Sequence, residues 1–401
     1  MRQFLIHLIL VLISGLTFAQ IVTTQPEFPT QTDNIVIFFD ATQPGAEELL
    51  NYTGTVYAHT GVNTNVGDWQ HVIGDWGQTN QPALIRLGTN LYQLTVGNPR
   101  QFYGVTNPSE QILELAIVFR SSDGNLQTRP DIFIPIYEHG LNIVINNPQV
   151  SNDFGDPLRS PAFLEQDSSL NISFYAVQIG TQLSNLSLFI DGSLVSQTTE
   201  DTLNFVVNYS DYSPGALNID AIGTDTSGTS DTSSFVLFVN PNRVNQTPPA
   251  GTEPGINYNS ATSITLMLQA PDKNFVYVLG DFNDWKVGTN YFLKRYATGP
   301  QDVYWWITLN GISPGTEYAF QYLVDGNIRI GDPYGHKVLD PSNDQYISPE
   351  TYPNLKPYPQ GKTDHLVTTF QTGVAPYQWN VTDFQRPAKT DLVNFESIGG
   401  P

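Results

Sequence analysis

The sequence predicts an all-β protein made of three β-sandwiches in a row, and three observations lead to this prediction. The composition is rich in strand and turn formers, with 22 Phe, 20 Tyr, 32 Gly and 28 Pro, and only 14% of the residues are charged. Apolar residues alternate with polar ones in short runs that turn clusters separate. The 401 residues suffice for several domains of about 100 to 200 residues each.

The first residues, "MRQFLIHLILVLISGLTFAQ", have the pattern of a secretory signal peptide. A basic Arg2 precedes an apolar run that ends near Leu16, and the small-residue pattern Thr17-Phe18-Ala19 follows it. The run is too short for a stable transmembrane helix. We therefore expect cleavage after residue 19 and a secreted protein, extracellular, periplasmic or at the cell surface, without membrane insertion.

Charge and cysteine content narrow the classes of partner. The chain has no cysteine, so an exported protein of this sequence has no disulfides and each domain depends on its own apolar core. The net charge of −21 repels a phosphate backbone and an anionic membrane surface. Nucleic acid is therefore not an expected partner, whereas a neutral polysaccharide is.

The alternating runs divide into successive modules. The first β-sandwich is predicted over residues 20–139, from runs such as "NIVIFFD" and "ILELAIVFR". A second, immunoglobulin-like sandwich is predicted over 140–242, where Asp191-Gly192 marks a hairpin, and we interpret it as a spacer. A Pro- and Thr-rich linker follows over 243–255.

The first module contains a cluster of aromatic residues and histidine. "VYAHTGVNTNVGDWQHVIGDWGQ" brings Tyr57, His59, Trp69 and Trp76 within twenty residues of one another. Such a cluster resembles those of starch-binding sandwiches, which makes the four residues candidate carbohydrate contacts. The alternative is that both tryptophans pack against their own strands. We expect no metal at His59 and His71, because no cysteine or well-spaced carboxylate completes a ligand set.

A third module, predicted over 256–361, has several spaced motifs. "LGDFNDWK" is followed by "YWWITLNGISPGTEYAFQYLVDG" and then by "GDPYGH". These motifs resemble carbohydrate-binding module family 48, an early-set β-sandwich that precedes the barrel of many glycoside hydrolases of family 13. The residues that carry the resemblance are Gly280, Phe282, Asn283, Trp285, Pro314, Gly315, Tyr318, Val324, Asp325, Gly326, Asp332 and Pro333.

The resemblance implies a glucan contact at Trp285, with Asn283 in the same motif, because the tryptophan of glycogen-binding members stacks on a glucose ring. Two further binding positions depart from the family pattern. Gln321 stands where a lysine is expected, and Ile328 stands near the place of a second tryptophan. The alternative for Trp285 is a packing role in its turn.

The tail, 362–401, contains "RPAKTDLVNFE" at 386–396, which looks like the segment that leads into the barrel of α-amylase-type enzymes. Such a barrel takes about 250 residues and uses two carboxylates, whereas five residues follow Glu396 in this sequence. We therefore expect no catalytic residue, metal or cofactor in this chain. The expected partners are an α-glucan such as starch or glycogen and a catalytic barrel in a longer form.

The first interpretation is thus the amino-terminal accessory region of a secreted α-amylase-type enzyme of glycoside hydrolase family 13, truncated before its barrel and inactive alone. A second interpretation is a free-standing extracellular glucan-binding protein. A third is an immunoglobulin-like spacer or adhesion array that needs no ligand.

Overall fold

The computed structural model describes residues 20–151 and 154–375. The expected signal peptide over 1–19 and the barrel-entry segment at 386–396 lie outside the described residues. The described chain is nearly all β, with a single four-residue α-helix, α1 (Pro99–Phe102), so the predicted all-β class of tandem β-sandwiches is confirmed. No helix among these residues combines the length and the apolar character that crossing a membrane requires. Short 3₁₀ turns are η1 (Glu47–Leu49), η2 (Pro157–Arg159), η3 (Tyr209–Asp211), η4 (Asp281–Asn283), η5 (Thr289–Tyr291) and η6 (Asp344–Tyr346).

The chain divides into two compact units. One holds residues up to 148 together with 171–205 and 219–234, and the other holds 149–170, 206–218 and the residues from 235 onward. The strands of the middle sandwich are therefore shared between both units, and the module boundaries expected from the sequence stay predictions.

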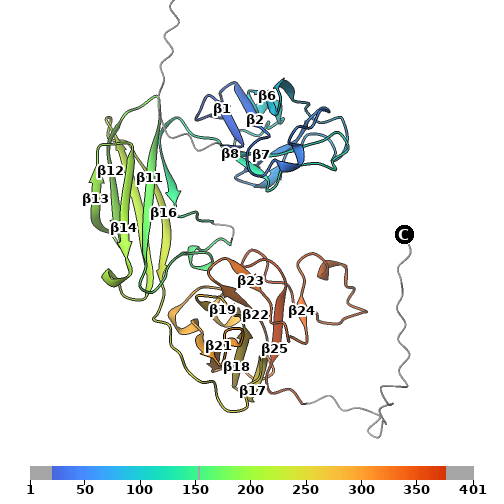
Figure 1. Ribbon diagram of the computed structural model, residues 1–401, viewed down its shortest axis with the longest axis vertical. Coiled ribbons are helices and arrows are strands. Elements are labelled where there is room, and N and C mark those ends of the chain that lie inside the picture. Colours follow the sequence, from blue (N-terminus) through green and yellow to red (C-terminus); the bar gives the residue numbers. More distant parts are fainter. Residues whose placement is uncertain (1–19, 152–153, 376–401) are drawn as a thin grey trace, which may run out of the picture. The chain divides into compact units, whose positions relative to one another are not determined.

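The first sandwich, drawn in blue to cyan in Figure 1, packs a sheet of order β1-β2-β6-β5 against one of order β4-β3-β7-β8. Alternation explains its core, since Ile35, Ile37 and Phe39 of β2 are fully buried while the residues between them are partly exposed. Phe39 stacks on Phe119 of the other sheet with ring centroids 4.3 Å apart. Its strands are β1 (Val22–Gln25), β2 (Ile35–Asp40), β3 (Tyr57–Thr64), β4 (Gly67–Gln70), β5 (Ile85–Gly88), β6 (Leu91–Gly97), β7 (Ile112–Arg120) and β8 (Ile132–Pro135).

The middle strands form a sheet of order β10-β16-β15-β12-β13 and a sheet of order β14-β11-β9. Asp191 and Gly192, at φ +46° and +74°, make the two-residue turn between β12 and β13, because both residue types tolerate this left-handed conformation. The strands are β9 (Gly140–Asn147), β10 (Ala162–Leu164), β11 (Ser169–Ile179), β12 (Leu183–Ile190), β13 (Ser193–Thr198), β14 (Thr202–Asn208), β15 (Gly215–Asp225) and β16 (Ser230–Val239).

The third set, yellow to red in Figure 1, pairs a sheet of order β17-β18-β21-β20 with one of order β19-β22-β25-β24, to which β23 is added beside β22. Trp305, which is fully buried, fills the space between the two sheets with Phe320 and Tyr322. The strands are β17 (Gly255–Ser260), β18 (Ser263–Gln269), β19 (Val276–Gly280), β20 (Lys294–Ala297), β21 (Val303–Asn310), β22 (Glu317–Val324), β23 (Ile328–Ile330), β24 (Val338–Leu339) and β25 (Val367–Gln371).

A second apolar cluster covers the other face of the β19-β22-β25-β24 sheet. Trp285, Tyr277 and Leu279 belong to it, and Leu158 and Phe163 pack against it from the segment that precedes and forms β10. The backbone N–H of Val287 donates to the carbonyl of Leu158 at 2.8 Å, so this segment is fixed to the turn that follows β19. Both faces of this sheet are therefore buried.

Candidate functional site

The outer face of the β4-β3-β7-β8 sheet brings several of the predicted aromatic side chains together. On β3, Ala58 points into the core and is fully buried, so Tyr57 and His59 point to the opposite face. The antiparallel register places Tyr57 opposite Arg120 and His59 opposite Val118 on β7. Figure 1 shows β7 beside β8, the strand that borders this face.

The two tryptophans meet at His59. The imidazole lies nearly parallel to Trp69, at 5.4 Å between ring centroids and 26° between planes. Trp76 meets the same imidazole edge-on, at 5.0 Å and 78°. Trp69 in turn contacts Phe133 of β8 edge-on at 6.4 Å. We call Tyr57, His59, Trp69, Trp76 and Phe133 the aromatic surface.

Part of the aromatic surface faces solvent. Trp76 and Phe133 are each 44% exposed, a large fraction for residues of their size. Trp69 and His71 have φ of +48° and +54°, a left-handed conformation that is costly for bulky residues. His71, which directly follows β4, has its Nε2 2.9 Å from Glu110 Oε1. This contact joins the end of β4 to the segment before β7. The end of β4 and the residues after it are therefore attached to the rest of the sandwich at His71.

Arg120, which the sequence did not single out, is buried beneath the aromatic surface and contacts two of its rings. Its side chain is fully buried, and its guanidinium lies 5.5 Å from the ring of Tyr57 and 5.7 Å from that of Trp76, within the range of cation–π attraction. It donates to the carbonyls of Ser121, at 2.7 Å, and Gln78. Trp76 therefore lies against a buried charged group that these hydrogen bonds hold in place.

Gln81 links this cation to the histidine. Its Oε1 accepts from Arg120 Nε at 2.7 Å, and its Nε2 lies 2.6 Å from His59 Nδ1. Burial, followed by the nearby charge of Arg120, lowers the pKa of His59, and Asp131 opposes this weakly. The imidazole is therefore neutral at and above neutral pH. Gln81 was also missed, since nothing in the sequence pattern around it distinguishes it from other loop amides.

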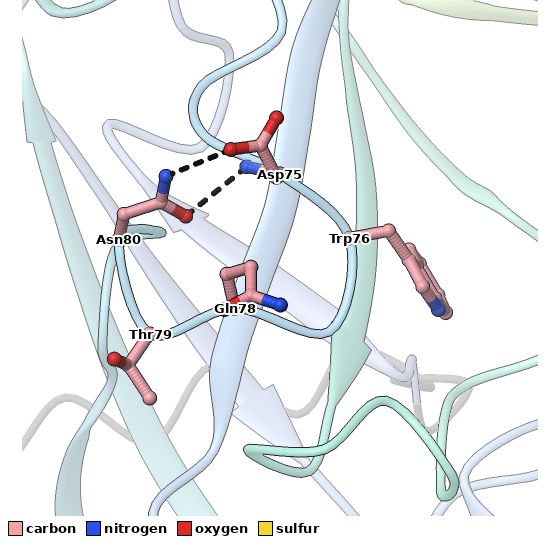
Figure 2. Close-up of a pocket in the computed structure, with 5 residues that line it drawn as sticks. All are labelled: Asp75, Trp76, Gln78, Thr79 and Asn80. Atoms are coloured by element: carbon pink, nitrogen blue, oxygen red, sulfur yellow. Dashed lines mark hydrogen bonds between the residues drawn. The ribbon is translucent and has the colours of Figure 1, made fainter.

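The loop before Gln81 has a shallow depression of about 450 Å³, which Figure 2 shows with its lining residues Asp75, Trp76, Gln78, Thr79 and Asn80. The Asn80 side chain closes a ring with Asp75, donating to its carboxylate and accepting from its backbone N–H, both at 3.1 Å. Trp76 points away from this ring in Figure 2. Trp76 thus lines the same depression as the polar side chains of this loop, while its indole points away from Asp75 and Asn80.

Trp285 and Asn283, the candidate contacts of the third module, are placed differently. Trp285 is 1% exposed, and its indole N–H donates to Asp281 Oδ1 at 3.1 Å. Asn283 uses its side chain inside the turn, accepting from the Gly280 backbone N–H at 2.8 Å and donating to the Val278 carbonyl at 3.0 Å. A ring enclosed to this degree presents no face to a sugar.

Chain segments cover the positions around Trp285. Arg159 Nη2 and Lys362 Nζ reach Asp284 at 3.0 and 2.7 Å, which lowers the pKa of that carboxyl to about 2, with the Lys362 hydrogen bond as the largest cause. Gln321, at the position where the family pattern has a lysine, is fully buried and donates to the carbonyls of Asp364 and Leu366, each at 2.7 Å. Ile328 is 39% exposed and adds no aromatic ring.

Within the parts of the chain that the structure describes, no group of three or more His, Cys, Asp or Glu side chains gathers as a metal site would require. The chemistry that the aromatic surface offers is stacking and hydrogen-bond donation.

Comparisons with known proteins show no family for this chain. No family model matches the sequence, and no curated protein matches it. Solved structures that resemble it include fibronectin(III)-like modules of Clostridium thermocellum CbhA, at 16% identity and TM-score 0.20, covering 24% of this chain and 96% of that one. A Bacteroides ovatus protein, SGBP-B of a mixed-linkage glucan utilization locus in complex with a mixed-linkage heptasaccharide, has 14% identity and TM-score 0.20, with 48% and 46% covered.

A putative membrane anchored protein from Corynebacterium diphtheriae has 11% identity and TM-score 0.21, covering 77% of this chain and 88% of that one. Scores this low support no inference about function. The β-sandwich fold follows from the sheets of the chain itself.

Proposed function

We propose that this chain is a secreted, non-catalytic array of β-sandwiches whose first sandwich binds a neutral glucan through the aromatic surface. The observation that carries the proposal is the exposed Trp76, held by Arg120 beside the Trp69–His59 stack. The apolar C–H face of a pyranose packs well on such rings. The net charge of −21 favours a neutral polysaccharide over an anionic one.

We further propose that the chain is an accessory region of an α-amylase-type enzyme, in which residues 256–361 form a family 48-like module next to a catalytic barrel. The motif from Gly280 to Trp285 supports this form, because its residues make the compact turn in which Asn283 bonds two backbone groups. Residues 20–139 are then the sugar-binding module and 140–242 the spacer.

A spacer or adhesion array is the second candidate function, and the covered surface of the third module favours it. Leu158, Tyr358 and Leu355 pack over the cluster that contains Trp285, so this module offers no glucan platform there. If the aromatic surface of the first sandwich also binds no sugar, the function that remains is a spacer that separates other parts of an extracellular assembly.

The Trp76→Ala substitution is expected to reduce strongly the retention of the protein in native gels that contain amylopectin or mixed-linkage β-glucan. Loss of a stacked ring weakens sugar binding by on the order of tenfold. Because the ring is 44% exposed, the melting temperature should stay close to that of the parent. Affinity electrophoresis in both gels and thermal unfolding measure the two effects.

Tyr346→Ala is the matched control, since Tyr346 is an aromatic residue of the third module and is 80% exposed. It should migrate like the parent. Parent migration that no concentration of either polysaccharide retards would refute glucan binding and favour the spacer.

A further inference from the structure

The hydrogen-bonding groups below the aromatic surface leave His59 only one arrangement of its proton. Arg120 Nε is a donor only, so the Gln81 atom that receives its hydrogen bond must be the amide oxygen. The other end of the amide is then the NH₂ group, which can only donate, and it faces His59 Nδ1 at 2.6 Å. His59 Nδ1 therefore accepts, and the neutral imidazole carries its proton on Nε2.

Burial, followed by the charge of Arg120, lowers the pKa of this imidazole and favours its neutral form. Arg120 from β7 disfavours the protonated form, and Asp131, next to β8, favours it more weakly. A proton on Nδ1 would also meet the donor hydrogens of Gln81. The Nε2–H group has no hydrogen-bond partner among the described residues, although the side chain is half-buried.

The two tryptophans of the surface also differ from the others that the structure describes. Trp285, Trp305 and Trp306 donate their indole N–H groups to Asp281, to Ala270 and to Gln246. For Trp69 and Trp76, no such acceptor is found in the described ranges. None of these N–H groups is among the buried polar atoms without a partner, so water reaches them, and a ligand with acceptor oxygens can take the place of that water.

We propose that the aromatic surface recognises an acceptor oxygen of a neutral sugar through the Nε2–H group of His59, and that Gln81 and Arg120 are positioning residues that hold this donor in its tautomer. This inference rests on the proposed function and adds a specificity-determining residue to it. Stacking on Trp76 supplies contact that any pyranose satisfies, whereas a fixed donor requires a hydroxyl or ring oxygen at one place. Recognition is then unaffected by pH wherever His59 is neutral.

The tautomer is tested without any ligand. The full chain, labelled with ¹⁵N in its histidine side chains, gives long-range ¹H–¹⁵N correlations that distinguish protonated from unprotonated ring nitrogens, and the His59→Gln variant assigns the signals. We expect a neutral imidazole with the proton on Nε2 from pH 7 to pH 9. A proton on Nδ1 would overturn the inference.

Binding to amylopectin and to mixed-linkage β-glucan tests the role of the donor. His59→Phe keeps a ring against Trp69 but removes the donor, and binding should weaken by about threefold to tenfold, the effect of one neutral hydrogen bond. His59→Gln should bind more tightly than His59→Phe, because its amide nitrogen reaches the place of Nε2 and donates there. Equal affinity of the two variants would contradict a donor role.

Gln81→Glu gives a signature that a merely structural role does not. The introduced carboxylate accepts from Arg120 and from His59 Nδ1–H, and its charge raises the pKa of His59. Below that raised pKa the imidazolium still has its Nε2–H donor. Above it the remaining proton stays on Nδ1, so the donor is lost and binding should fall as pH rises. The parent should show no such fall between pH 7 and pH 9.

These variants distinguish glucan binding at this surface from the role of His59 in it. If the parent is retained by neither polysaccharide, or if Trp76→Ala is retained like the parent, glucan binding at this surface fails as a function. If Trp76→Ala loses retention while Gln81→Glu binds like the parent at every pH, the function stands and the role of His59 is refuted.

Discussion

The Trp285→Ala variant is expected to lower the free energy of unfolding of the third sandwich by about 3–5 kcal/mol, the range for truncating a large buried aromatic residue. The ring is 1% exposed and packs among Tyr277, Leu279 and Leu323, and its N–H donates to Asp281. Truncation leaves a cavity and an acceptor without its donor. Hydrogen exchange of peptides from β19 and β22, followed by mass spectrometry, measures the loss in this sandwich alone.

Tyr346→Ala again serves as the control, because an 80% exposed side chain contributes little to the fold. Its exchange should match that of the parent. A Trp285→Ala protein with parental protection of β19 and β22 but without polysaccharide retention would contradict a packing role. It would show instead that the ring serves as a sugar platform.

The fold class was predictable because strand alternation is a local property of the sequence. In β2 the pleat of the strand turns Ile35, Ile37 and Phe39 inward and leaves Val36 and Phe38 between them partly exposed, although all five are apolar. The turn at Asp191-Gly192 was predictable for the same reason, since two adjacent residues determine it. The domain boundaries expected at 139 and 242 stay predictions, because the two compact units do not test them.

The candidate site was predictable only in its aromatic part. Tyr57, His59, Trp69 and Trp76 are close in sequence, so their clustering could be noticed there. Arg120 reaches Gln81 across 39 positions, and only the pairing register of β3 and β7 places it under Tyr57. A single sequence does not give that register. Alternation within "ILELAIVFR" does place Arg120 on the outer face, which was the available signal.

The covering of Trp285 was unpredictable for a related reason. Leu158 and Phe163 precede this tryptophan by more than a hundred positions, and they belong to a stretch that was interpreted as part of a spacer. A turn motif specifies its own backbone, but it does not specify which distant segment packs over it. The resemblance to family 48 concerned the residues of the turn and left the environment of its ring open.

Replacing Arg120 by methionine is expected to destabilise the first sandwich by about 3 kcal/mol and to abolish polysaccharide retention together. The guanidinium is fully buried and supplies donors to Gln81 Oε1 and to the carbonyls of Ser121 and Gln78. Methionine fills much of the volume but leaves these acceptors unpaired, at about 1–3 kcal/mol for each buried group that water does not reach. Trp76 then loses its cation–π partner, and the loop that contains it loses its anchor.

Arg129→Met is the matched control in the same sandwich. The Arg129 side chain is 67% exposed, and its 3.1 Å ion pair with Glu48 lies in solvent, so its removal should change stability by less than about 1 kcal/mol and leave retention unchanged. Hydrogen exchange of β3 and β7 reports stability, and gels containing each polysaccharide report binding. If Arg120→Met and Arg129→Met behave alike in both measurements, the buried guanidinium does not organise the aromatic surface. A variant of Arg120 that destabilises β3 and β7 while retention persists would show instead that Trp76 keeps its orientation without the cation beneath it.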